Sequence, residues 1–184
     1  MRKLTVNIIV FLSLALLSFP ASAQRTMSGQ PSLHVSVLYN GPSACAEAFF
    51  SQYTLGGYWQ AGIEGKAYDV PISTGSRLDY IHTAVSSGYM YRVAGTRNRL
   101  LNYYMGGRVF MGVEIVDPWK TLPSYVSTGI KPVSFLYGIS PRMELEVFFC
   151  RKCALLFTAG VPVNFSSNIS WIHYEAGLGF KVAL

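Results

Sequence analysis

Beyond residue 80, this chain places apolar residues at every second position over unusually long runs. From 101 to 115 the odd-numbered residues are mostly apolar, and the residues between them are smaller or more polar. The same alternation occurs over 81–93, 133–149 and 172–184. A period of two is typical of β-strands, because successive side chains point to opposite faces, whereas a helix would scatter these residues around its surface.

The length of these runs distinguishes a membrane barrel from a soluble β-protein. Strands of soluble proteins usually have about five or six residues, whereas a tilted strand that crosses a bilayer needs roughly nine to eleven. The four runs exceed that length, and the second face of each is rich in glycine and charge. This pattern suits a narrow barrel with lipid outside and packed side chains inside. The sequence therefore predicts an all-β transmembrane barrel of the outer-membrane type.

The first 23 residues predict export. Arg2 and Lys3 precede a mostly apolar run over 4–19, and small residues lead up to Ala23. We therefore expect a signal peptide that is cleaved after Ala23, rather than an uncleaved anchor, because the apolar core is short. After Ala23 no stretch approaches the ~20 apolar residues of a membrane helix, although 51% of the chain is hydrophobic and only 13% is charged.

Connections between the apolar runs predict eight antiparallel strands in up-and-down order. Short turns are expected at 95–98, at 150–152 and at Gly56-Gly57, with Gly65-Lys66 as the alternative for the last of these. Longer connections are expected at 40–47, 71–76, 116–131 and 162–167. Long and short connections then alternate, which places both chain ends beside the short turns, the periplasmic side of outer-membrane barrels. The barrel domain spans 32–184 after a mobile tail at 24–31, and its expected strands are 32–39, 48–55, 58–70, 77–94, 99–115, 132–149, 153–162 and 169–183.

Charged residues fall mainly on the predicted inward faces. An eight-stranded barrel has room inside for side chains but not for a water channel, and an unpaired buried charge is costly. We therefore expect the inward charges to pair with one another and to fill the barrel. The expected network contains Arg92, Arg108, Glu114, Arg142, Glu144, Glu146, His173, Glu175 and Lys181.

Two other interpretations remain open. Some small outer-membrane barrels modify lipid with a histidine, a serine and a carboxylate, and His82, His173, Ser86 and Ser134 are expected to face inward. No nucleophile elbow or close Ser/His/Asp spacing accompanies them. The third interpretation is a soluble periplasmic barrel that binds an apolar ligand, with its apolar faces inward. We favour a barrel with no enzymatic activity, because the sequence contains no phosphate-binding loop and no metal-ligand spacing, so no cofactor or metal is expected.

Three cysteines follow the signal peptide. Cys150 and Cys153 have the CxxC spacing, which in redox proteins lies at a helix N-terminus that lowers a thiol pKa. Here the pair flanks a predicted β-turn, so we expect a turn disulfide or two free thiols instead of a redox centre. Cys45 is expected in the connection at 40–47, at the other end of the barrel and out of reach of the pair.

Several segments of the mature chain occur together in one known family. They are Tyr58-Trp59-Gln60, Gly88-Tyr89, Phe135-Leu136-Tyr137-Gly138, Arg142-Met143-Glu144-Leu145-Glu146 and Glu175-Ala176-Gly177-Leu178-Gly179-Phe180. Together they resemble the conjugal transfer protein TraO encoded on conjugative transposons of Bacteroides and relatives. One departure is the end of the chain, where barrels commonly finish on an aromatic residue and this sequence finishes on Leu184.

The resemblance implies an outer-membrane component of a conjugative DNA-transfer apparatus. Its implied partners are other conjugative-transfer proteins and outer-membrane lipid, and the family offers no catalytic motif to carry over. On length, 40–47 and 116–131 are the best candidate partner surfaces. The formal net charge of the whole chain is +6, but no basic cluster with interleaved aromatic residues is present, so direct nucleic-acid binding is not expected.

Overall fold

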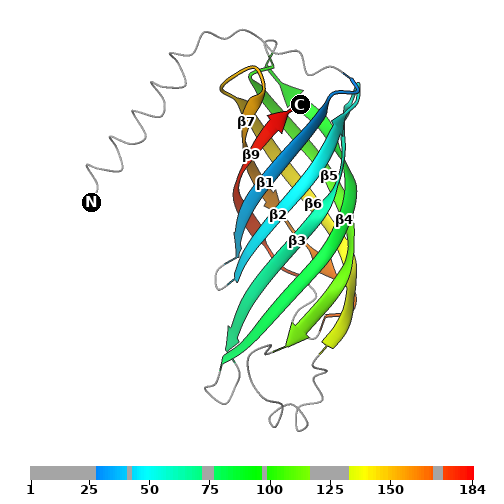
Figure 1. The fold of residues 1–184 in the computed structure, drawn as a ribbon, viewed down its shortest axis with the longest axis vertical. Helices are drawn as coiled ribbons and strands as arrows, with labels where there is room; N and C mark the ends of the chain where they lie inside the picture. The colour runs from blue at the N-terminus through cyan, green and yellow to red at the C-terminus, as the bar shows by residue number, and fades with distance from the viewer. Residues whose placement is uncertain (1–27, 41–42, 72–76, 97–98, 117–132, 168–171) are drawn as a thin grey trace, which may run out of the picture.

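One antiparallel sheet closes on itself to form a barrel (Figure 1). The computed structural model describes residues 28–40, 43–71, 77–96, 99–116, 133–167 and 172–184. Within these ranges the strands are β1 (Pro31–Asn40), β2 (Ser43–Tyr53), β3 (Gly57–Pro71), β4 (Arg77–Gly95), β5 (Leu101–Val116), β6 (Val133–Phe148), β7 (Cys153–Gly160), β8 (Val163–Asn164) and β9 (Glu175–Ala183).

Strand pairing gives eight strand positions around the barrel, which we name staves. Neighbours around the barrel run β5-β4-β3-β2-β1-β9-β7-β6, and β6 pairs with β5 to close the circle. The two-residue β8 pairs with β6 beyond the end of β7, so β7 and β8 together make one interrupted stave. The prediction of an eight-stranded antiparallel up-and-down barrel is confirmed. No helix of the described residues is long and apolar enough to cross a membrane.

The second strand starts earlier than predicted. β2 begins at Ser43 and pairs with β1 from its first residue. The long connection expected at 40–47 is therefore wrong, since only residues 41–42 separate β1 from β2, and the strict alternation of long and short connections fails at this point. The outward residues of this part of β2 are alanines, which are too small to show an apolar period.

The last two staves are broken where the sequence predicted unbroken strands. Gly160 ends β7 because Val161-Pro162 follows, and proline has no N–H to donate to a ladder. The final strand was expected from 169 but starts at Glu175. The residues just before it contact the broken stave instead: Ile172 forms a bridge with Val163, and the N–H of His173 donates to the Pro162 carbonyl, 3.0 Å away.

The four middle strands and the turn between β2 and β3 agree more closely with the sequence. β3, β4, β5 and β6 each begin and end within two residues of their expected limits. β3 starts at Gly57, and Gly65 and Lys66 lie in the middle of that strand, so the alternative turn there is wrong. The expected signal peptide lies outside the described residues, as do the tips of the connections at 95–98, 71–76 and 116–131. In the expected tail, the Gly29 N–H donates to the Tyr53 carbonyl, 2.7 Å away.

Apolar side chains cover the outside of the barrel, and polar ones fill the inside. On β1, Val35 is 59% exposed, whereas its neighbours His34 and Ser36 are 2% and 1% exposed. The other staves repeat this alternation, for example β2 and β6. A soluble barrel that binds an apolar ligand requires the inverse orientation, so the structure does not support that interpretation.

The two ends of the barrel differ. We name the end that holds the connections β2–β3, β4–β5 and β6–β7 the turn end, and the opposite end the loop end. The start of β1 and the C-terminus both lie at the turn end (Figure 1). β3, β4, β5 and β6 have 15, 19, 16 and 16 residues, whereas β1, β2, β7 and β9 have 10, 11, 8 and 9. The wall is therefore much longer on the β3–β6 side.

Gly177 permits the close approach of β9 to β1. A Cβ atom at this position would lie 2.0 Å from the Val37 carbonyl oxygen and 2.6 Å from the Leu38 Cα. We expect Gly177→Ala to destabilise the barrel by about 1–3 kcal/mol, because strand backbones cannot yield as a side chain can. Gly65→Ala is the matched control, since no atom lies within 4 Å of its Cβ position. Urea unfolding of both variants in detergent micelles measures the effect, and equal stabilities would contradict it.

Candidate functional site in the barrel interior

All six glutamates of the chain are buried inside the barrel. Among the residues that the structure describes, four cations are buried with them: Lys66, Arg108, Arg142 and Lys181. A buried carboxylate is costly without a cation or hydrogen-bond donors around it. The contacts divide these charges into two clusters and one separate carboxylate. The six glutamates are Glu47, Glu64, Glu114, Glu144, Glu146 and Glu175.

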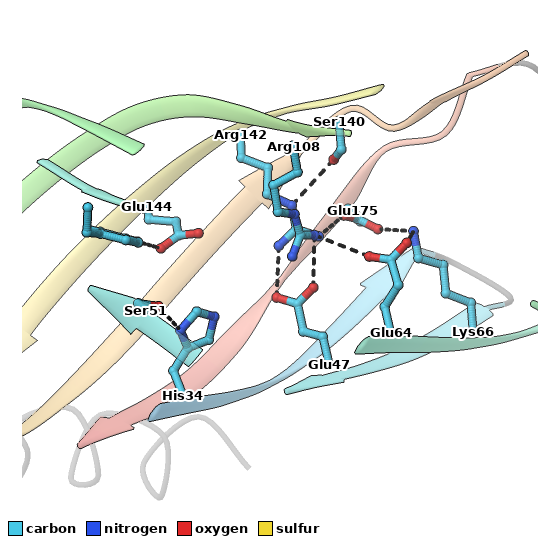
Figure 2. Close-up of polar contacts among 11 residues, drawn as sticks. His34, Glu47, Ser51, Glu64, Lys66, Arg108, Ser140, Arg142, Glu144 and Glu175 are labelled. Atoms are coloured by element: carbon cyan, nitrogen blue, oxygen red, sulfur yellow. Dashed lines mark hydrogen bonds and ion pairs between the residues drawn. The ribbon is translucent and has the colours of Figure 1, made fainter. Parts of the chain in front are cut away.

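Arg142 is the centre of the first cluster. Its guanidinium donates to Glu47 Oε1 over 2.8 Å and also donates to a Glu175 carboxylate oxygen. A weaker bond joins Arg142 Nε to the Ser140 hydroxyl over 3.4 Å. Because Arg142 comes from β6, Glu47 from β2 and Glu175 from β9, this group connects strands across the interior (Figure 2).

Arg108 and Lys66 complete the first cluster. Arg108 lies 3.0 Å from the second oxygen of Glu47 and 3.4 Å from Glu64, and its guanidinium stacks 4.3 Å above the Phe49 ring. Lys66 lies 3.2 Å from Glu175 and 3.7 Å from Glu64. Figure 2 shows the two guanidinium groups beside one another, with Glu47 facing both. Three carboxylates and three cations balance within the central ion cluster, which consists of Glu47, Glu64, Lys66, Arg108, Arg142 and Glu175.

The second cluster lies towards the turn end and uses tyrosines. Lys181 is 3.2 Å from Glu146 and 3.6 Å from the centre of the Tyr58 ring. Tyr58 donates its hydroxyl hydrogen to Glu144, and Tyr53 donates to Glu146. The two carboxylates outnumber the single cation, Lys181, so the neutral tyrosine hydroxyls supply the remaining hydrogen bonds to them. We name this group the tyrosine cluster; its members are Tyr53, Tyr58, Tyr104, Glu144, Glu146 and Lys181.

Of the remaining predicted network residues, Glu114 and His173 lie apart from both clusters, and Arg92 is the cross-strand partner of Tyr104 in the tyrosine cluster. Glu114 accepts hydrogen bonds from Ser167 over 2.8 Å and from Ser134 over 3.4 Å. Arg92 is only half-buried. His173 lies outside the strands, 5.4 Å from the Tyr68 ring, instead of on an inward face of a final strand. The structure thus brings Arg108, Arg142 and Glu175 together in one cluster and places the remaining predicted residues elsewhere.

Sequence reasoning missed Glu47, Glu64 and Lys66. Glu47 was assigned to a connection because β2 was started too late. Glu64 and Lys66 share the even-numbered face of β3 with Tyr58 and Gln60, so the alternation does contain the signal. The signal is weak because several outward residues of β3 are alanine or glycine.

The interior does not resemble a hydrolase site. His34 Nδ1 lies 3.3 Å from the Ser51 hydroxyl, but the two residues are 2% and 0% exposed, and the other contact of the imidazole is a stack on Phe49. His82 and Ser86 are likewise buried. A substrate carbonyl needs access to both the nucleophile and the base. Within the described ranges, no group of three or more His, Cys, Asp or Glu residues is arranged to hold a metal ion.

The cysteines occupy opposite ends of the barrel. Cys45 is buried in β2 near the loop end, instead of lying in a connection. Cys150 and Cys153 flank the turn between β6 and β7 as free thiols. Cys150 is exposed, and its sulfur accepts a hydrogen bond from the backbone N–H of Cys153, 3.1 Å away.

Comparisons with known proteins give one family and one fold. The family described as "Conjugative transposon protein TraO" matches residues 47–184. Among curated proteins, none matches significantly. The attachment invasion locus protein Ail of Yersinia pestis is 8% identical, with a TM-score of 0.50 over 85% of this chain and 99% of Ail. At this identity the similarity concerns the fold alone, which is that of an outer-membrane barrel.

Two other solved barrels were also found. Neisserial surface protein A is 11% identical over 84% of this chain and 95% of its own, with a TM-score of 0.48. The N-terminal barrel domain of Pseudomonas aeruginosa OprF is 7% identical over 85% of this chain and 98% of its own, with a TM-score of 0.49.

Proposed function

This chain belongs to the TraO family of conjugative transposon proteins, and from that premise we propose that it is a non-enzymatic outer-membrane barrel with a structural or docking role in a conjugative DNA-transfer apparatus. Its proposed partners are other conjugative-transfer proteins and the lipid around it. Direct binding of nucleic acid is not part of the proposal, because four basic residues of the described strands, Lys66, Arg108, Arg142 and Lys181, are paired with carboxylates inside the barrel.

The filled interior carries this proposal. Ion pairs and tyrosine hydrogen bonds connect β2, β3, β5, β6 and β9 through the interior, and an eight-stranded barrel leaves little space beyond its own side chains. Neither a strand of DNA nor a polar substrate has a path through such an interior. The surfaces left for function are the two ends and the outer wall, which are surfaces for contact rather than for chemistry.

The proposed orientation follows from the connections. Outer-membrane barrels place short turns in the periplasm and longer loops outside the cell, so the turn end faces the periplasm. Cleavage of the signal peptide after Ala23 would leave the new N-terminus on that side. The connection at 116–131, which the sequence suggests as a partner surface, would then be presented outside the cell.

A charged residue in the lipid-facing wall tests the membrane placement. Val35 lies near the middle of β1 and points outward, so Val35→Arg should cost about 2–4 kcal/mol of folding free energy in lipid vesicles. Gln52→Arg, at an outward position near the turn end of β2, should cost about 0–1 kcal/mol. Urea titration of both variants measures the difference. If Val35→Arg is tolerated as well as Gln52→Arg, the wall does not face hydrocarbon.

Mating assays test the role in transfer. A donor that lacks this protein should transfer DNA only at the background level, and the wild-type chain should restore transfer. His82→Gln and His173→Gln should also restore it, because neither histidine acts in chemistry under this proposal. If a folded His82 or His173 variant fails in transfer and the membrane lipid profile changes with it, the lipid-modifying enzyme becomes the better explanation. Cross-linking in wild-type donors, followed by identification of attached transfer proteins, tests docking directly.

A further inference from the structure

The turn between β6 and β7 holds two cysteines whose thiols lie within hydrogen-bond reach of one another. Cys150 and Cys153 flank the two-residue connection Arg151-Lys152. The backbone N–H groups of Phe149 and Cys150 both donate to the Cys153 carbonyl, over 3.2 and 3.4 Å, so the ladder continues up to Cys153. Phe148 pairs with Ala154, so Cys153 faces Phe149, and Cys150 lies one position beyond it in the turn. The Cys150 sulfur lies 3.1 Å from the backbone nitrogen of Cys153, and the two thiols are hydrogen-bonded to each other. A small shift of the two side chains is therefore enough to close the bond.

The two sulfurs are not equivalent. The Cys150 sulfur accepts the N–H of Cys153 at 3.1 Å and is exposed, whereas Cys153 is half-buried. Desolvation raises the pKa of the Cys150 thiol, but hydrogen bonds from the backbone N–H groups of Lys152 and Cys153 and from the Cys153 thiol outweigh it and lower that pKa. N–H donors stabilise a thiolate, which is the nucleophilic form of cysteine. Cys150 thus has the properties of an attacking thiol, and Cys153 is placed to attack it in turn.

Cys45 lacks both properties. It is 6% exposed inside the barrel, towards the loop end, and burial raises the barrier to any reagent that must reach its sulfur. The chain therefore contains an internal control for the reactivity of the turn pair.

We propose that Cys150 and Cys153 form a thiol–disulfide exchange site, with Cys150 as the attacking thiol and Cys153 as the resolving thiol. The Cys150 thiolate attacks one sulfur of a disulfide-bonded oxidant and displaces the other sulfur as a thiolate. The Cys153 thiol then gives its proton to solvent and attacks the Cys150 sulfur, which releases the second sulfur of the oxidant. Two electrons pass from the turn to the oxidant, which leaves as a dithiol, and the turn is closed by a Cys150–Cys153 disulfide.

In the cell, this inference rests on the proposed orientation, because the turn must face an oxidising periplasm. Its chemistry does not depend on conjugation. A test on the purified protein therefore separates the two: thiols that stay free would refute the exchange site and leave the proposed function unaffected.

The experiment uses the full chain folded in detergent micelles, with oxidised glutathione as the oxidant. Mass spectrometry should show the loss of two hydrogens and a Cys150–Cys153 link, while Cys45 stays free. Cys153→Ser should accumulate a glutathione mixed disulfide at Cys150. Cys150→Ser should acquire the same adduct at Cys153 roughly threefold or more slowly, because a thiol with a lower pKa has a larger thiolate fraction at neutral pH.

Three results would overturn the proposal. The first is two free turn thiols after incubation with oxidised glutathione under conditions that oxidise a small dithiol control. The second is equal rates for the two single variants, which would remove the assigned roles. The third is a loss of thiol reactivity at the turn pair that a chelator reverses and a reductant does not reverse. This result would identify a bound metal instead of a disulfide.

Discussion

Replacing Arg142 by methionine is expected to destabilise the folded barrel by about 3–5 kcal/mol. Arg142 is 3% exposed and pairs with Glu47 of β2 and Glu175 of β9, the two strands that flank β1. Methionine has a similar length, so packing is largely kept, and the loss comes from two carboxylates that remain buried with less positive charge around them. Urea unfolding in detergent micelles, monitored by tryptophan fluorescence, measures the change.

A compensating variant distinguishes this explanation from a simple packing defect. When Glu47→Gln is added to Arg142→Met, much of the lost stability should return, because two carboxylates, Glu64 and Glu175, then balance two cations, Lys66 and Arg108. Arg151→Met in the exposed turn is the surface control and should change stability by less than about 0.5 kcal/mol. If the variant that carries both Arg142→Met and Glu47→Gln is as unstable as Arg142→Met alone, charge pairing is not what Arg142 contributes.

Replacing Lys181 by methionine is expected to cost about 3 kcal/mol. Lys181 is 1% exposed and lies 3.2 Å from Glu146, one of the two carboxylates of the tyrosine cluster. The loss is placed at the lower end of the range because Tyr53, Tyr58 and Tyr104 continue to donate hydrogen bonds to these carboxylates. The midpoint of the heat-induced mobility shift on gels, followed for the variant and the wild type, provides the measurement.

Lys152→Met is the matched control for this second prediction. Lys152 lies in the exposed turn at the same end of the barrel, so the same chemical change there should leave the midpoint nearly unchanged. The two clusters share no side chain, but Glu144 of the tyrosine cluster interacts electrostatically with Arg142. The losses from Arg142→Met and Lys181→Met should therefore deviate from additivity in a double variant, by about 0.5 kcal/mol or more. Strict additivity would mean that the two clusters are energetically independent.

The sequence predicted the barrel better than it predicted the contacts inside it. Alternation over β5 and β6 indicated which faces point outward, because large apolar residues mark every second position there. The start of β2 was missed because Ala44, Ala46 and Ala48 mark the outward face only weakly. The break at Pro162 had a visible signal in the proline itself, but where the pairing of β7 resumes is decided by the neighbouring stave β6.

Partner choice inside the barrel could not be predicted from the sequence. Glu47 and Arg142 are 95 residues apart, and they meet only because the strands are tilted and the sheet is closed with a particular stagger. The alternation along a strand predicts whether a side chain points inward, but it does not predict how far along the barrel axis that side chain lies. The assignment of Tyr53 and Tyr58 to the carboxylates of β6 likewise depends on that stagger, as does the balance of three cations and three carboxylates in the central ion cluster.

Because its strands differ in length, this barrel has two different flanks in the plane of the membrane. β5 and β6 keep apolar residues on their outer face along 16 residues each, whereas β7 and β9 have 8 and 9 residues in total. A flat bilayer thick enough to cover the apolar face of β5 and β6 extends beyond β7 and β9, so in such a bilayer the barrel leans or the surrounding lipid thins on the side of β7 and β9. Each ångström of such mismatch costs a fraction of about 1 kcal/mol. A neighbouring membrane protein would therefore meet a different bilayer thickness on each flank, which favours one side for lateral association before any specific contact forms.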